Sequence, residues 1–180
     1  MRIISGKFKS RVLKTHQDLP VRPTTDYAKE SLFNILNNWY YFDDISVLDL
    51  FTGTGNISFE FASRGSDRVV AIDSNRDCIN FVESTITELG LDNVMAASWM
   101  DAMDYVELTT EKFKVIFADP PYDYEDYPKL IQTILDRELL KENGTLIIEH
   151  DKRHDFSDVK QFEDHRTYGN VNYSFFSFQE

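Results

Sequence analysis

The residues best suited to chemistry form the tetrapeptide Asp119-Pro120-Pro121-Tyr122, which directly follows the apolar run 115–118. Proline fixes φ near about −65° and has no N–H group, so the tetrapeptide is stiff and presents acceptors only, among them the Asp119 carboxylate. Rigid acceptors beside an aromatic ring are suited to holding a planar group by its N–H donors while the ring stacks on its face. A proline loop that merely ends a strand is the alternative interpretation.

A second candidate is a glycine-containing turn that follows the apolar run 45–51. Gly53 and Gly55 alternate in this turn, and Asp49 lies just before it. Glycines in this spacing allow a tight turn and the close approach of a ligand because they have no Cβ. Ser58 replaces the third glycine of a dinucleotide fingerprint, which lowers the case for a pyrophosphate site. A strand-to-helix turn that needs glycine only for its geometry is the alternative.

Two further carboxylates follow the next predicted strands. Asp73 stands 24 residues after Asp49, close to the spacing at which an acidic residue binds ribose hydroxyls in nucleotide-binding α/β folds. Asp101 comes 28 residues later, where a side chain could meet an adenine amino group. Ligands of open α/β sheets bind beyond the carboxyl ends of the strands, so we expect these carboxylates at one edge of a sheet.

An alternating series of strands and helices must position these residues. The apolar patterns predict strands at 45–51, 68–72, 93–97, 114–118 and 145–149. They predict helices at 55–64, 75–89, 101–108 and 125–140. Residues 159–166 and 171–178 predict two further strands, and their short connection permits only antiparallel pairing.

The residues before this series predict a short β-hairpin at 2–13 and a helix at 24–40. Apolar members of the hairpin are Ile3, Phe8, Val12 and Leu13. The fold class is therefore α/β, with a mostly parallel, helix-covered sheet and an antiparallel hairpin at the C-terminal end.

Composition is typical of a single domain that folds on its own. The chain has 180 residues, of which 42% are hydrophobic. It has one cysteine and no run near the ~20 apolar residues of a membrane span, and residues 1–7 become polar too soon for a secretory signal. The four histidines are scattered, so no metal site is expected. We expect a cytoplasmic monomer with no membrane partner.

The net charge of −12 argues against general nucleic-acid binding, which depends on neutralising phosphates with Lys and Arg. The charge is uneven, however, because residues 1–30 carry a net +4 and the remaining 150 residues carry −16. This asymmetry favours a basic segment that faces a polyanion on an acidic body. A short basic segment without any partner is an equally good interpretation of the charge alone.

Several motifs together resemble the bacterial small-subunit rRNA guanine-N2 methyltransferases. They are the glycine-containing stretch 49–55, residues 60–65, the tetrapeptide 119–122, and the N-terminal stretches 1–7, 22–26 and 30–34. The resemblance spans nearly the whole chain. It implies a Rossmann-like class I methyltransferase fold with a seven-stranded sheet whose last strand is antiparallel, and S-adenosylmethionine as the cofactor.

The resemblance also implies a role for each candidate residue. Cofactor contacts would be Asp49 near the amino group, Gly53 and Gly55 under the amino-acid and ribose parts, Asp73 at the ribose, Asp101 at the adenine, and Thr52, Ser74 and Ala102. Catalytic residues would be Asp119, Pro120 and Tyr122. RNA contacts would be Lys7, Lys9, Arg11, Arg22, Thr24 and Asp26.

The resemblance thus divides the chain into an RNA-binding extension, residues 1–40, and a cofactor-binding and catalytic core, residues 41–180. The implied partner is small-subunit rRNA within a ribosomal particle. Another amino methyltransferase, acting on adenine or on a protein glutamine, is an alternative, although 180 residues leave little room for a target-recognition region. A non-catalytic RNA-binding assembly factor is a second alternative, against which the intact tetrapeptide 119–122 argues. A nicotinamide-dependent oxidoreductase is a third.

Overall fold

The computed structural model describes residues 1–15, 18–20 and 24–178, so the predicted RNA contact Arg22 lies outside the described residues. In the described part, seven strands form one sheet in the order β3-β2-β1-β4-β5-β7-β6. The strands are β1 Ser46–Asp49, β2 Arg68–Asp73, β3 Met95–Trp99, β4 Phe113–Ala118, β5 Leu140–His150, β6 Phe162–Tyr168 and β7 Val171–Phe176. Strands β1 to β5 pair in parallel, whereas β7 is antiparallel to both β5 and β6. The predicted sheet is confirmed.

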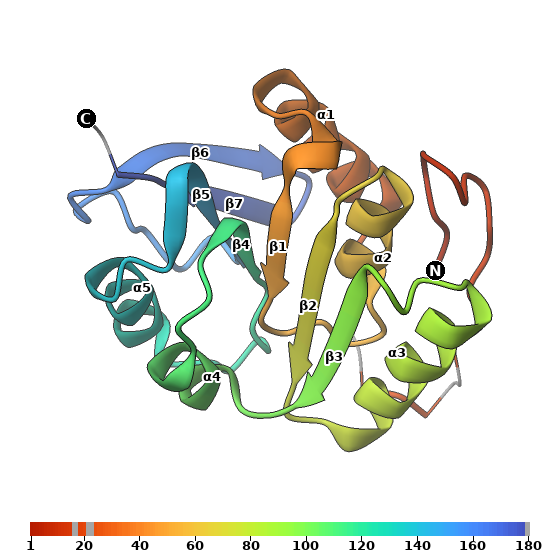
Figure 1. Cartoon of the computed structure of the whole chain (residues 1–180). Helices are drawn as coiled ribbons and strands as arrows, with labels where there is room; N and C mark the ends of the chain where they lie inside the picture. Colours follow the sequence, from red (N-terminus) through yellow and green to blue (C-terminus); the bar gives the residue numbers. More distant parts are fainter. Residues whose placement is uncertain (16–17, 21–23, 179–180) are drawn as a thin grey trace.

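Helices cover both faces of this sheet (Figure 1). They are α1 Asp26–Trp39, α2 Asn56–Ser63, α3 Arg76–Glu88, α4 Ala102–Leu108 and α5 Tyr127–Asp136, with a short 3-10 turn, η1, at Phe42–Asp44. Buried side chains of α1, α2 and α3 form one core cluster with the sheet, and those of α4 and α5 form a second. The sheet is therefore the middle of three layers, which explains why its parallel strands are nearly continuous apolar runs.

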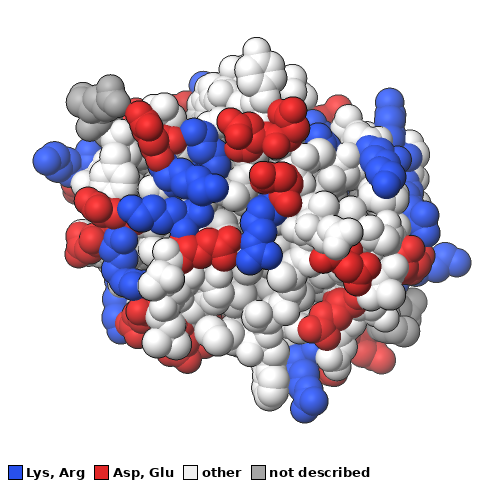
Figure 2. Space-filling view, in the orientation of Figure 1, with Lys and Arg blue, Asp and Glu red and all other residues white. Residues whose placement is uncertain are grey.

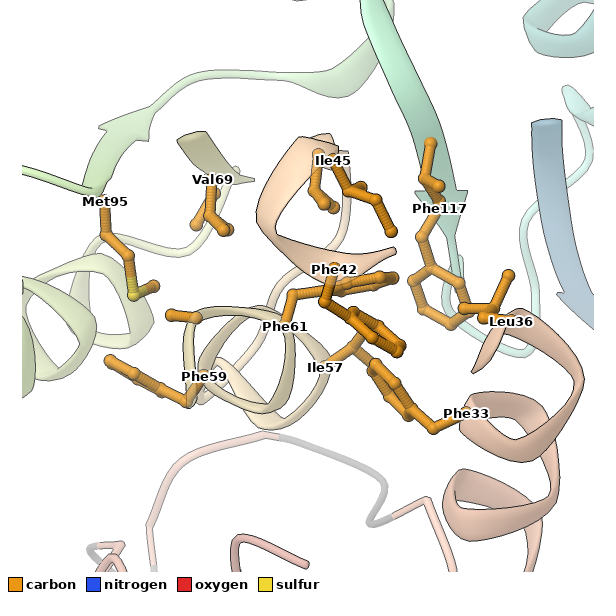
Figure 3. Packing of buried hydrophobic residues seen from close by; sticks show 14 of the residues in the cluster. Phe33, Leu36, Phe42, Ile45, Ile57, Phe59, Phe61, Val69, Met95 and Phe117 are labelled. Atoms are coloured by element: carbon orange, nitrogen blue, oxygen red, sulfur yellow. The ribbon is translucent and has the colours of Figure 1, made fainter. Parts of the chain in front are cut away.

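Side-chain alternation along each strand serves the two cores in turn. Val47 belongs to the cluster beneath α1 and α2, whereas its neighbour Leu48 belongs to the cluster beneath α4 and α5. The first cluster is rich in aromatic rings, and Figure 3 shows Phe33, Phe42 and Phe61 lying together between α1 and α2. The ring centroids of Phe33 and Phe61 are 4.7 Å apart. This packing fixes α1 against α2, the helix that begins at the glycine-containing turn.

Several predicted elements differ from those observed. Strand β5 begins at Leu140 rather than at 145, and β6 covers Phe162–Tyr168 rather than 159–166. Helix α5 ends at Asp136 rather than at 140, because Glu138 adopts a φ of +52° and Leu140 already pairs with Phe113 in the sheet. Strand β3 lies two residues later than predicted, at 95–99. The N-terminal hairpin pairs through a single antiparallel bridge, Arg2–Val12, and the Val12 side chain is 61% exposed rather than apolar core. A short solvent-facing hairpin has no second sheet to bury that residue.

Candidate active site

The candidate residues that follow strands lie at one edge of the sheet. Strands β1, β2, β3 and β4 pair in parallel, so their carboxyl ends point the same way, toward the bottom of Figure 1. The turn after β1 holds Thr52, Gly53 and Gly55, and the other strands are followed by Ser74, by Asp101 with Ala102, and by Asp119, Pro120 and Tyr122. This arrangement matches the edge at which open α/β sheets bind ligands.

The turn between β1 and α2 requires glycine at two positions. Gly53 has a φ of +56° and Gly55 a φ of +85°, both in the left-handed region that disfavours residues with a Cβ. A Cβ on Gly55 would also lie 2.5 Å from the ring of Phe59 in α2. Gly55 is the N-cap of α2, so the free backbone N–H groups of that helix begin beside the turn. We call residues 50–55 the cofactor loop, after the role that the sequence predicts for it.

Asp73 ties this loop to the end of β2. Its Oδ2 accepts a hydrogen bond from the backbone N–H of Gly53 at 2.8 Å, and its Oδ1 accepts one from Asn75 at 2.8 Å. The side chain is partly exposed, and each carboxylate oxygen has a second lone pair. Asp73 is therefore able to hold the loop and to accept hydroxyl donors of a ribose at the same time.

Asp49, the last residue of β1, is a buried acid at this edge. Its Oδ2 accepts a hydrogen bond of 2.7 Å from the Ser58 hydroxyl, which also lies 3.0 Å from the hydroxyl of Thr52. Its Oδ1 has no hydrogen-bond partner among the described residues. Burial raises the pKa of Asp49 to about 6, although the Ser58 hydrogen bond opposes the shift. A ligand with a cationic or N–H group would satisfy this oxygen, as the amino group of S-adenosylmethionine would.

Trp99 and Asp101 lie at the end of β3. Asp101 is the N-cap of α4 and accepts from the backbone N–H groups of Met103 and Asp104 at 2.8 and 3.2 Å. Trp99, which was not among the predicted site residues, is 58% exposed, and its indole N–H donates to the Ser74 carbonyl at 2.9 Å. It ends β3, so the same rule that selected the other strand ends would have found it.

The tetrapeptide after β4 has a buried base and an exposed tip. Pro120 is buried, Asp119 is partly exposed, and Tyr122 is 64% exposed. The guanidinium of Arg153 lies 4.3 Å from the centroid of the Tyr122 ring and donates to the Tyr122 carbonyl at 3.2 Å. Asp151 holds Arg153 by an ion pair of 2.6 Å. Arg153 was not predicted, because nothing in its local sequence links it to a residue 31 positions earlier.

A second carboxylate, Glu149, belongs to this part of the site. Ala118, the last residue of β4, pairs with Ile148 of β5, and Asp119 and Glu149 are the residues that directly follow this pair. Glu149 is buried and lies opposite Tyr173 in the antiparallel pairing of β5 with β7. Burial raises the pKa of Tyr173, and the negative charges of Glu149 and Asp119 raise it further. The predicted strand 145–149 ends at Glu149, so the strand-end rule could have selected this residue from the sequence.

The predicted RNA contacts Lys7 and Arg11 lie away from the strand ends, beside the C-terminal ends of α2 and α3. Lys7, Lys9 and Arg11 are exposed, and the backbone N–H of Lys7 donates to the carbonyl of Ser63, at the far end of α2 from the cofactor loop. Figure 2 shows Lys and Arg side chains along the right edge, where Figure 1 places the N-terminal segment. The remaining described candidates are Thr24, which is partly buried, and Asp26, which forms an ion pair of 2.9 Å with Arg2.

A family model described as "Conserved hypothetical protein 95" matches residues 1–177. The chain belongs to that family. Among its relatives, "Putative rRNA methyltransferase YlbH" of Bacillus subtilis is 36% identical over 155 residues, covering 84% of this chain and 83% of that protein. "Ribosomal RNA small subunit methyltransferase D" of Haemophilus influenzae is 28% identical over 155 residues, covering 84% and 79%.

A solved structure shares the fold. "Putative methyltransferase yhhF" of Escherichia coli superposes with a TM-score of 0.85, covers 98% of this chain and 96% of its own, and is 24% identical. The predicted class I methyltransferase fold and the predicted resemblance to small-subunit rRNA methyltransferases are confirmed. The roles of individual residues in this member of the family remain predictions.

Proposed function

We propose that this protein transfers a methyl group from S-adenosylmethionine to the N2 amine of a guanine in small-subunit rRNA. The methylation of rRNA follows from the family and from the names of its relatives. The cofactor is S-adenosylmethionine, which fits the residues at the strand ends: Asp49 for its amino group, the cofactor loop beneath it, Asp73 for its ribose, and Trp99, Asp101 and Ala102 for its adenine. When bound, it supplies a methyl group on a positively charged sulfur.

The acceptor edge at Asp119 and Pro120 carries the proposal for an amino group. An exocyclic guanine amine is a weak nucleophile because its lone pair is delocalised into the ring. The Asp119 carboxylate and the Pro120 carbonyl accept hydrogen bonds from its two N–H groups. These hydrogen bonds favour a pyramidal nitrogen whose lone pair is free to attack the methyl group. Holding two reactants in line is worth roughly 7–11 kcal/mol of the barrier. Asp119 then accepts the proton that the methylated nitrogen loses.

The neighbouring carboxylate supports guanine over adenine. Guanine presents N1–H and two N2–H donors on one edge, whereas the corresponding edge of adenine has an acceptor at N1. Glu149 and Asp119 follow the last residue pair of β4 and β5, and the charges of both reach Tyr173, so their combined negative charge favours the donor-rich edge. Tyr122 stacks on the base, which leaves its helix or loop to reach the site.

The setting of the reaction completes the proposal. None of the described helices is long and apolar enough to cross a membrane. We infer that the protein works in the cytoplasm as a monomer and meets its rRNA within a ribosomal particle. In such a particle, ribosomal proteins supply basic surface that the acidic body of this chain lacks.

Transfer of tritium from labelled S-adenosylmethionine tests the substrate class. The protein is incubated in parallel with small ribosomal subunits, naked small-subunit rRNA, duplex DNA and a mixture of proteins. We expect label in the RNA of the first sample or of the first two. Label in DNA or protein alone, or in no sample although the cofactor binds, would contradict the proposal.

A further inference from the structure

A buried ion pair connects the N-terminal segment, residues 1–13, to the cofactor loop. Lys29 of α1 is 1% exposed and Glu60 of α2 is fully buried, with 3.2 Å between the Lys29 Nζ and Glu60 Oε2 atoms. The Lys29 ammonium also donates to the carbonyl of Arg2 and to the Asn56 side chain, both at 2.8 Å. Asn56 is the first residue of α2 and directly follows the cofactor loop. One ammonium group therefore contacts the segment and the first residue of α2, which is next to the loop.

Glu60 holds the same segment from the other side. Its carboxylate accepts the backbone N–H groups of Ile4 and Ser5 at 2.9 and 3.1 Å, and the guanidinium of Arg64 at 3.0 Å. A buried carboxylate with this many donors is well satisfied, and loss of either member of the pair would leave an uncompensated charge. The catalytic chemistry uses neither Lys29 nor Glu60, so the pair serves another purpose.

The far end of α2 fastens the segment again. The Ser63 hydroxyl donates to the Ser5 carbonyl at 2.6 Å and accepts from the backbone N–H of Phe8 at 3.0 Å. Gly6 has a φ of +86°, and a Cβ there would lie 1.9 Å from the Ser63 carbonyl oxygen. At the near end, the Thr54 hydroxyl of the cofactor loop lies 3.5 Å from the Met1 sulfur. The segment thus follows α2 along its length and reaches the loop.

We propose that docking of the N-terminal segment through Lys29 and Glu60 fixes the conformation of the cofactor loop, so that cofactor binding and RNA binding strengthen each other. Lys29, Glu60 and Asn56 are positioning residues in this scheme. The RNA half of the proposal rests on the proposed function, because the segment carries the predicted phosphate contacts. The intramolecular half rests only on the contacts above. By thermodynamic reciprocity, bound RNA must raise the affinity for the cofactor by the same factor by which the bound cofactor raises the affinity for RNA.

The test measures the affinity of S-adenosylhomocysteine by calorimetry, with and without a small-subunit rRNA fragment. Gly6→Ala undocks the segment by a backbone clash. Gly65→Ala is its matched control, because Gly65 has a φ of +110° and a Cβ there would meet no atom within 4 Å. Ser63→Ala is a milder second variant that removes only the hydroxyl, and Ser66→Ala is its control, because the buried Ser66 hydroxyl has no partner among the described residues.

We expect Gly6→Ala and Ser63→Ala to lower the affinity for S-adenosylhomocysteine about fivefold or more relative to their controls. In both variants, RNA should no longer change that affinity. A merely structural pair would lower the melting temperature and leave the affinity of the folded protein unchanged. Equal affinities in folded variants and controls would overturn the proposal. If the variants bind S-adenosylhomocysteine more weakly but the wild-type protein does not bind rRNA, the link between the segment and the cofactor loop stands, and rRNA is rejected as the substrate.

Discussion

At the scale of single residues, the site depends on carboxylates whose surroundings differ. Asp49 is buried with one unsatisfied oxygen, Asp73 is fixed by two backbone N–H groups, and Asp119 is partly exposed beside Glu149. Spacing and position after a strand were enough to select the first three from the sequence. The hydrogen bond from Ser58 to Asp49 was not predicted, because Ser58 was considered in the sequence only as the residue that replaces a glycine.

Asp119→Asn should separate chemistry from cofactor binding. The amide keeps the shape but loses a negative acceptor for the amine and for its proton, so we expect methyl transfer to fall by roughly 10²–10⁴-fold. The affinity of S-adenosylhomocysteine should stay within about twofold, because the cofactor lies against other strand ends. Asp123→Asn, at an exposed position of the same loop, is the control and should change neither quantity. Full activity of Asp119→Asn would exclude the assigned role.

Asp49→Asn should alter the pH dependence of stability. The pKa of Asp49 is raised in the folded protein, so the folded state binds more protons than the unfolded state between about pH 4 and 6. The contribution of this residue to the free energy of unfolding therefore falls as the pH rises through that window, and stays low above it. Asparagine removes the penalty, which is worth roughly 1–3 kcal/mol at pH 7.

Urea unfolding of both proteins without cofactor, from pH 4 to pH 8, measures this difference. The variant should be the more stable protein at pH 7, and the gap should close toward pH 4. It should also bind S-adenosylhomocysteine more weakly, since the carboxylate at the end of β1 is gone. A variant that is less stable at pH 7 at every ionic strength would show that the carboxylate is not penalised by burial.

At the scale of elements, strands and helices position the site by where they end. The alternation of apolar runs and turn residues predicted strands β1 to β5 along the chain and the antiparallel end of the sheet. It predicted α5 too long, because residues 136–138 contain no glycine or proline, and the boundary is set by the positive φ of Glu138 and by the pairing of Leu140 with Phe113. The partner of Lys29 was beyond prediction, since Glu60 lies on another helix.

Gly55→Ala tests the element that joins β1 to α2. The alanine would have to adopt a φ of +85° and would meet the Phe59 ring at 2.5 Å, so we expect a loss of about 1–3 kcal/mol in the free energy of unfolding. Cofactor affinity should fall as well, because the loop must shift. Gly90→Ala, at a φ of +67° with open space around it, controls for backbone strain alone. Equal losses in both variants would assign the effect to strain and remove the packing argument.

At the scale of the whole molecule, charge is divided between a basic N-terminal segment and an acidic body. The segment does not extend into solvent as a free arm, because Ser63 and Glu60 hold its backbone on α2. The sequence predicted the charge division but not this docking, which depends on contacts between residues more than 50 positions apart. Lys7 and Lys9 thus face solvent from a fixed surface.

Charge reversal in this segment should weaken RNA binding without affecting the cofactor loop. Lys7→Glu and Lys9→Glu together should reduce the affinity for small-subunit rRNA and lower the slope of log affinity against log salt by about one to two, roughly one per phosphate contact. Lys129→Glu in α5, on the other face of the sheet, is the control. Filter binding from low to moderate salt measures both slopes, and identical slopes would refute phosphate contacts at Lys7 and Lys9.

Methylation of a guanine N2 amine in small-subunit rRNA is tested most directly on the product nucleoside. Small-subunit rRNA from cells that lack the protein, incubated as assembled particles with the purified protein and S-adenosylmethionine, is digested to nucleosides and analysed by mass spectrometry. We expect the amount of N2-methylguanosine to rise with the wild-type protein and to stay unchanged with Asp119→Asn. The appearance of N6-methyladenosine, or of no methylated nucleoside with a protein that binds the cofactor, would contradict the proposed reaction.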